Sequence, residues 1–141
     1  MLSAGRRTME KIRLCIGSDD ERTIADSHMG DTQRFHLYDI FADGKYLFVG
    51  TRENSVKEMD HAQGDKMQRI IELLKEVDVF VARRKSPNFM KIAEKTRYQP
   101  VVVTQEEIGE IVAALGNRFA ELDAFVTRRD NGERSSDIPT F

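Results

Sequence analysis

The feature that most constrains the fold is an amphipathic segment, DKMQRIIELLKEV at 65–77, followed at once by the apolar run DVFVAR at 78–83. An almost wholly apolar run of this length is typical of a strand buried between two layers. A helix that leads directly into such a strand predicts an α/β fold. The apolar residues of the segment recur at the spacing of one helical face; they are Met67, Ile70, Ile71, Leu74 and Val77.

Three strands are predicted ahead of this helix. The first alternates apolar and polar residues with the period of a strand, and a polar stretch at 18–33 without helical period follows it as a loop. The next two strands are joined by Ala42-Asp43-Gly44, a hairpin signal with a glycine available for positive φ. We expect the three strands at 11–17, 34–41 and 45–53.

Two further helices are predicted after the buried strand, with another short apolar strand, PVVV at 100–103, between them. Ser86-Pro87 opens the first, because a polar N-cap followed by proline in the first turn is a helix start signal. Thr104 with Glu107 predicts a capping box for the last helix, over 108–122, in which Gly116 could introduce a bend.

The resulting order, β-β-β-α-β-α-β-α, predicts an α/β protein with a mixed five-stranded sheet of order 3-2-1-4-5 and helices on both faces. In that arrangement the chain leaves strands 1, 3 and 4 at the same edge. Open α/β sheets bind ligands where the connections diverge, here between strands 1 and 4. We therefore expect the loops with His28, His61 and Arg83-Arg84-Lys85 to meet at a binding edge.

Length and composition narrow the class of protein. A chain of 141 residues with 40% hydrophobic residues is the size of one domain, expected at 11–128, with a flexible lead at 1–10 and a disordered polar tail at 129–141. A net charge of −2 gives no field that would select nucleic acid or a membrane surface as partner. The single cysteine, Cys15, excludes an internal disulfide, and no apolar run spans a bilayer. We expect a cytoplasmic protein.

The candidate site residues each allow two interpretations from the residues alone. His28 is either a metal ligand or a turn residue, and His61 is either a ligand or solvated loop. The basic trio at 83–85 precedes a helix start, whose free N–H groups favour anions, but it also fits a solvated turn. Cys15 and His36 alternate within strands, which favours packing roles for both.

Three runs carry a resemblance to a known family: RLCIGSDDERTIADSHMGDTQRFHLYDIFADGK, GDKMQRIIELLKEVDVFVARRKSPNFMKIAEK and PVVV. Over roughly residues 11–122 the chain resembles the dinitrogenase iron-molybdenum cofactor biosynthesis family, which includes NifX- and NafY-type carriers and a carrier-like domain of NifB. The resemblance implies a ribonuclease-H-like three-layer fold and a non-enzymatic protein of nitrogen fixation. Such a protein transiently carries an iron-sulfur or iron-molybdenum-type cluster between donor and acceptor proteins.

The resemblance also assigns roles to residues. The family's His-Phe-Gly signature corresponds to His28-Met29-Gly30, which implies that His28 is a metal ligand and that Met29 and Gly30 lie with it at the cofactor. His61 is a second candidate ligand from its loop position alone. Methionine replaces phenylalanine, and it can fill the same apolar gap. Many relatives are rich in glycine at 82–86, whereas this chain is basic there. We therefore expect Arg83, Arg84, Lys85 and Ser86 to contact the anionic part of the cofactor.

Two other classes of function stay open at this point. Asp19 and Asp20 follow the first strand and suggest a two-metal nuclease, but Asp78 stands at the start of its strand, and Arg83 stands where a carboxylate would be needed. The second alternative is a ligand-free interaction domain. Strand 3 at the edge of the sheet could also pair with a second copy to form a homodimer.

Overall fold

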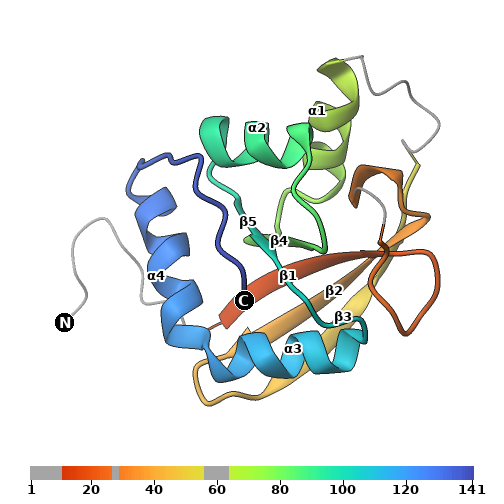
Figure 1. Ribbon diagram of the computed structural model, residues 1–141, viewed down its shortest axis with the longest axis vertical. Coiled ribbons are helices and arrows are strands. Elements are labelled where there is room, and N and C mark those ends of the chain that lie inside the picture. Colours follow the sequence, from red (N-terminus) through yellow and green to blue (C-terminus); the bar gives the residue numbers. More distant parts are fainter. Residues whose placement is uncertain (1–10, 27–28, 56–63) are drawn as a thin grey trace.

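The computed structural model describes residues 11–26, 29–55 and 64–141. Its strands form one sheet in the order β3-β2-β1-β4-β5 (Figure 1). β2 runs antiparallel to β1 and β3, and β4 runs parallel to β1 and β5. The predicted sheet order and strand directions are therefore confirmed. The strands are β1 (Lys11–Ser18), β2 (Arg34–Phe41), β3 (Tyr46–Glu53), β4 (Val79–Ala82) and β5 (Gln99–Val102).

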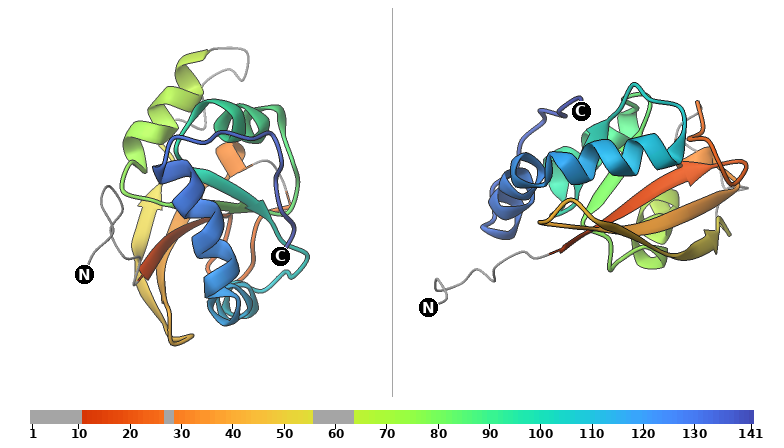
Figure 2. Two further views of the ribbon diagram at one scale, coloured as in Figure 1. Left: turned by 90° about the vertical axis from the view of Figure 1, so that its left-hand side faces the viewer. Right: turned by 90° about the horizontal axis from the view of Figure 1, so that it is seen from below.

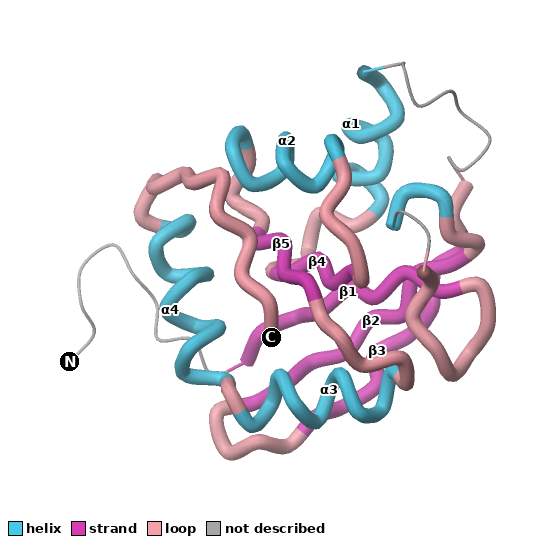
Figure 3. The backbone as a smooth tube through the Cα atoms, in the orientation of Figure 1, coloured by secondary structure: helices cyan, strands magenta, loops and turns pink. Residues whose placement is uncertain are grey.

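Helices cover both faces of this sheet, as predicted, and give the molecule three layers. α1 and α2 lie on one face, and α3 and α4 lie on the other (Figures 1 and 3). A short 3-10 helix, η1, follows the loop after β1. The layering is compatible with the ribonuclease-H-like description. The helical elements are η1 (Met29–Asp31), α1 (Gly64–Leu73), α2 (Pro87–Lys95), α3 (Ile108–Asn117) and α4 (Phe119–Asp130).

The alternation of side chains along β1 divides the core between these two faces. Ile12, Leu14 and Ile16 pack into the cluster beneath α3 and α4. Cys15 points the other way and packs with Phe80 beneath α1 and α2. This is the period-2 pattern expected of a strand buried on both sides.

The start and the end of the last predicted helix differ from the sequence-based expectation. Glu107 is the N-cap of α3 and makes no side-chain capping bond, so the Thr104–Glu107 capping box is wrong. The N–H of Ile108 instead donates to the carbonyl of Arg22, 2.8 Å away, in the loop after β1. The predicted bend occurs as a break between α3 and α4 at Arg118, two residues beyond Gly116.

The C-terminal segment also differs from the disordered tail expected from its composition. α4 continues to Asp130, and the segment beyond it returns along the outer side of β5. The N–H of Val102 donates to Pro139 O at 2.9 Å, and that of Phe141 donates to Val102 O at 2.8 Å. Ile138 and Phe141, the only two large apolar side chains of the segment, are buried. The segment is therefore held by two apolar anchors and by the edge hydrogen bonds of β5.

Candidate cofactor-binding edge

The loop after β1 lies at the predicted binding edge, where β1 and β4 end, and is shaped by Asp20. Oδ1 of Asp20 accepts hydrogen bonds from the backbone N–H groups of Arg22 and Thr23, each at 2.8 Å, and Oδ2 accepts one from the Thr23 hydroxyl. These hydrogen bonds, led by the backbone bond from Thr23, lower the pKa of Asp20 to about 2. Asp20 therefore holds the turn as a carboxylate at neutral pH.

The same loop is fastened to the start of α3 and to the end of β1. Ile24 N–H donates to Glu106 O at 2.9 Å, and Ala25 N–H donates to Gly17 O at 3.0 Å. Thr23 and Glu107 form an isolated antiparallel bridge. Figure 3 shows the loop and the N-terminal end of α3 at the same end of the sheet. Backbone hydrogen bonds therefore hold this loop in place as far as Ala25.

On the far side of that position the chain is anchored by Met29. Its side chain is only 5% exposed and packs in the α1–α2 cluster. The Thr32 hydroxyl donates to Met29 O at 2.9 Å. A Cβ on Gly17 would lie 2.9 Å from the Thr32 side chain and 3.0 Å from the Met29 side chain. Only glycine at position 17 therefore lets η1 pack this closely on β1.

The basic trio lies at this edge, as expected, but two of its members already have carboxylate partners. Arg84 Nε and Nη2 donate to the two oxygens of Asp26 at 3.2 and 3.1 Å. Hydrogen bonding by Arg84 is the main cause of the lowered pKa of Asp26. Arg83 Nη1 lies 3.4 Å from Glu106 Oε1. Lys85 is exposed and has no ion pair among the described residues.

A hollow of about 430 Å³ opens between the loop after β1, the end of β4 and the approach to α3. Four carboxylates and a single guanidinium line it, so the walls are predominantly acidic. The Nε atom of Arg83 is buried and has no hydrogen-bond partner among the described atoms. The lining residues are Asp19, Asp20, Thr23, Ile24, Ala25, Asp26, Arg83 and Glu106.

The sequence-predicted ligand residues are only partly covered by the structure. His28 and His61 lie outside the described residues, and Gly30 is described only as backbone of η1. Ser86 is buried, and its hydroxyl accepts a hydrogen bond from Phe89 N–H at 3.1 Å, which confirms it as the N-cap of α2. Within the described part of the chain, no three His, Cys, Asp or Glu side chains are grouped so that they could hold a metal ion.

The packing roles predicted for Cys15 and His36 are confirmed. Cys15 is fully buried, and burial raises the pKa of its thiol. The thiolate that would bind a metal is therefore disfavoured. His36 Nε2 lies 2.8 Å from the carbonyl oxygen of Asp20, which can only accept, so Nε2 is a donor. Nδ1 is engaged by the Thr51 hydroxyl, also at 2.8 Å, and both ring nitrogens are satisfied.

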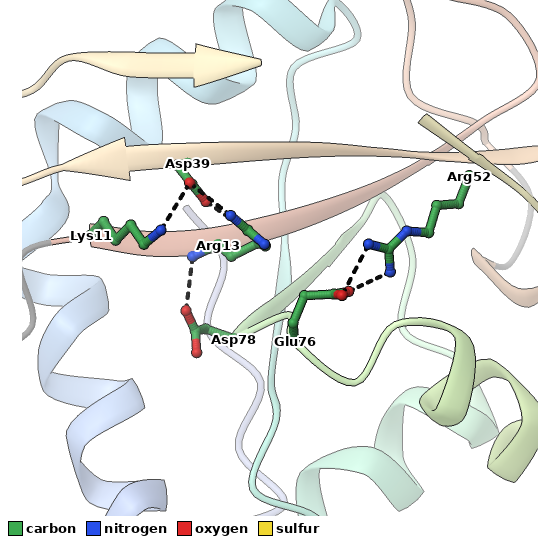
Figure 4. Close-up of polar contacts among 6 residues, drawn as sticks. All are labelled: Lys11, Arg13, Asp39, Arg52, Glu76 and Asp78. Atoms are coloured by element: carbon green, nitrogen blue, oxygen red, sulfur yellow. Dashed lines mark hydrogen bonds and ion pairs between the residues drawn. The ribbon is translucent and has the colours of Figure 1, made fainter. Parts of the chain in front are cut away.

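Sequence reasoning did not find a second group of charged residues, on the α1 side of β1, β2 and β3. Arg13 Nε and Nη2 donate to the carboxylate of Asp39 at 2.8 and 3.0 Å, and Arg52 pairs with Glu76 (Figure 4). Asp78 accepts a hydrogen bond from Arg13 N–H at 2.9 Å. Each of these charged residues is paired with another residue of the same cluster, which favours a structural role.

The geometry does not support the two-metal nuclease. Asp78 lies before β4, at the opposite end of the strand from Asp19 and Asp20. Asp20 is occupied by turn hydrogen bonds, and Oδ1 of Asp19 accepts one from Gln33 N–H at 2.9 Å. These carboxylates therefore do not converge on one ion position.

The fold and the edge define a class: an α/β protein with an open mixed sheet and a hollow at its switch point. Comparison with models of known protein families adds an independent finding. The model for dinitrogenase iron-molybdenum cofactor matches residues 10–118. The chain belongs to that family, and its role is therefore related to the iron-molybdenum cofactor. A search of curated proteins found no match. None of the described helices is long and apolar enough to cross a membrane.

Proposed function

We propose that this chain is a non-enzymatic carrier that binds an iron-sulfur or iron-molybdenum-type cluster, or its precursor, and passes it between donor and acceptor proteins in the cytoplasm. The family match over residues 10–118 carries the proposal. The edge supports it, because the chain on either side of positions 27–28 is fixed there beside an open hollow. Binding residues concentrate on loops that a rigid scaffold positions in this way.

In this proposal His28 is the principal metal ligand, with His61 as a second ligand, and Met29 and Gly30 complete the binding loop. Imidazole nitrogen is a suitable ligand for iron. Met29 anchors the loop from below rather than contacting the cargo, because its side chain is buried in the core. Ser86 acts through the start of α2, which it caps.

The first prediction concerns His28. His28→Ala should abolish or sharply weaken uptake of the cluster, because the imidazole ligand is lost while Asp26 and Met29, the described residues on either side, are unchanged. The measurement is the visible absorption of protein reconstituted anaerobically, with far-UV circular dichroism to confirm the fold. His36→Gln is the matched control, because His36 has only hydrogen-bonding partners within the protein. Equal cluster absorption in His28→Ala and the parent would refute the ligand role.

The same spectrum separates a carrier from a ligand-free interaction domain. An iron-sulfur species bound to the anaerobically purified parent protein colours it, whereas an interaction domain stays colourless. A parent protein that neither purifies with a chromophore nor takes one up on reconstitution contradicts the carrier proposal.

The basic trio takes part by exchanging partners. Without cargo, Arg84 faces Asp26 and Arg83 faces Glu106, so an anionic cluster must compete with two carboxylates. Both pairs are exposed on at least one side, and such pairs are weak and easily exchanged. The unpartnered Nε of Arg83 is one donor that an anion at this corner would satisfy.

The second prediction uses substitutions of opposite sign. Changing Arg83, Arg84 and Lys85 together to Ala should weaken uptake by at least about tenfold, since one charge-assisted hydrogen bond contributes about 1.5–3 kcal/mol. The salt dependence of uptake should also fall, because exposed charges are screened over about 8–10 Å. The pair Asp26→Asn and Glu106→Gln should strengthen uptake at low salt by freeing the two arginines.

The measurement is the cluster dissociation constant at low and high salt for the three proteins. If the triple variant takes up the cluster as well as the parent at low salt, the basic trio is only a solvated surface. Uptake that is lowered equally by both sets of substitutions would indicate damage to the loop and would contradict partner exchange.

A further inference from the structure

An exposed apolar surface that the carrier role leaves unused lies on strand β3. Tyr46, Leu47, Phe48 and Val49 are 48%, 58%, 52% and 39% exposed, and they are the exposed large hydrophobic side chains among the described residues. They follow one another directly, so both faces of one strand are apolar and open to solvent. Such a run is a recognised site of association.

The two edges of the sheet are treated differently by the chain. At the β5 edge the C-terminal segment hydrogen-bonds to Val102 and covers the strand. β3 ends the sheet on the other side and, within the described residues, pairs only with β2 (Figure 2). Among residues 11–26, 29–55 and 64–141, none covers the outer side of β3 as the C-terminal segment covers β5.

The hairpin fixes which backbone groups of β3 point outward. Phe41 N–H donates to Lys45 O at 2.9 Å, so 41 and 45 form a hydrogen-bonded pair. Hydrogen-bonded and non-hydrogen-bonded pairs alternate along an antiparallel ladder. The N–H and C=O groups of Leu47, opposite Asp39, therefore point toward β2. The N–H and C=O groups of Tyr46 and Phe48 point to the free edge.

This spacing is self-complementary. When two copies of β3 meet antiparallel about a two-fold axis at Leu47, Tyr46 of each copy lies opposite Phe48 of the other, and the four outward amide groups of each copy find partners. Tyr46 and Phe48 share one face, since both rings contact Tyr38, at 6.4 and 5.2 Å between centroids. Two cross-strand aromatic pairs therefore form on that face, and Leu47 meets its own copy on the other.

The charges near the axis permit this register. Lys45 lies opposite Val49 of the other copy, and Arg52 and Glu53 lie outside the paired stretch. The β-bulge where Val49 has no partner in β2 ends the regular part of the strand, so pairing is confined to 45–49. No like charges face each other, and the short ladder predicts a weak, reversible association.

We propose that a second copy of this chain pairs antiparallel with β3 about a two-fold axis at Leu47, which joins the two sheets into one. The inference is independent of the cofactor proposal, because the pairing uses the outer edge of β3, whereas the proposed carrier site lies where β1 and β4 end. The pairing leaves the hollow at Asp19–Asp26 of both copies outside the interface.

The test is disulfide cross-linking of the full chain through Leu47→Cys. Residues on the axis form a non-hydrogen-bonded pair with Cα atoms about 4.5 Å apart, within the range that a disulfide spans. Cys15 is fully buried and does not compete. Under mild oxidation, Leu47→Cys should give covalent dimer at least tenfold faster than Ala42→Cys, an exposed position in the same hairpin that has no counterpart across the axis.

A second substitution separates docking from random collision. Phe48→Lys in the Leu47→Cys background should slow cross-linking to the Ala42→Cys rate, because two aromatic pairs are lost and charge enters the edge. The half-exposed Phe48 side chain tolerates this change, as far-UV circular dichroism should confirm. Equal rates for Leu47→Cys and Ala42→Cys, or no effect of Phe48→Lys, would overturn the proposal and leave β3 to a different protein partner.

Discussion

At the scale of single residues, Gly17 determines how closely η1 packs on β1. A Cβ at this position would meet the Thr32 side chain at 2.9 Å, which buried side chains do not tolerate without displacement. Gly17→Ala should therefore destabilise the protein by roughly 1–3 kcal/mol and loosen Met29 together with the loop before it. Urea unfolding measures the loss, and cluster uptake reports the loop.

Gly50→Ala is the matched control for this prediction. It also adds one methyl group to a strand, but no atom lies within 4 Å of the added Cβ. The free energy of unfolding should change by less than about 0.5 kcal/mol. Similar losses in the two variants would show that close packing against Thr32 is not the reason for glycine at 17.

Single residues also show where sequence reasoning succeeds and where it stops. The roles of Cys15 and His36 were predicted because alternation along a strand is a local signal. The partners of the basic trio were not, since Asp26 lies 58 residues from Arg84 and Glu106 lies 23 from Arg83. No local pattern links residues at such separations, and only the sheet order brings them together.

At the scale of elements, the two predicted helix caps behave differently and allow a paired test. Ser86 caps α2 through a 3.1 Å hydrogen bond to Phe89 N–H. Thr104 has no capping role, because α3 begins at Ile108, whose N–H bonds to the loop after β1. Ser86→Ala should cost about 1 kcal/mol of unfolding free energy, and Thr104→Ala should cost close to none.

Thermal or urea unfolding of both variants measures this difference. An equal loss would mean that Thr104 supports α3 after all, and no loss in Ser86→Ala would contradict the cap on α2. The contrast has a physical reason: a cap next to proline acts within its own helix, whereas α3 receives its first hydrogen bond from a distant loop. Local signals therefore predict helix starts only where local partners satisfy them.

At the scale of the whole molecule, the sheet order could be predicted because hairpins and right-handed crossovers leave few alternatives. The packing of the C-terminal segment could not be predicted, because the segment is mostly polar. Its two large apolar residues make their contacts with residues that are distant in the sequence. The family match ends at residue 118, yet Leu122 and Val126 of α4 and the terminal Phe141 belong to the core beneath α3. The fold therefore includes a C-terminal part beyond the matched region.

The segment's contribution can be measured by ending the chain after Asp137. Ile138 and Phe141, 6% and 9% exposed, would be lost together with the two hydrogen bonds to Val102. Burial of one large apolar side chain contributes about 1.5–3 kcal/mol, so the free energy of unfolding should fall by roughly 3–6 kcal/mol. The uncovered β5 edge should also promote aggregation.

Thr140→Ala, which keeps the backbone bonds and removes an exposed side chain, is the control and should match the parent in urea unfolding. A shortened chain as stable and soluble as the parent would show that the segment, although packed in the structure, adds nothing to the fold.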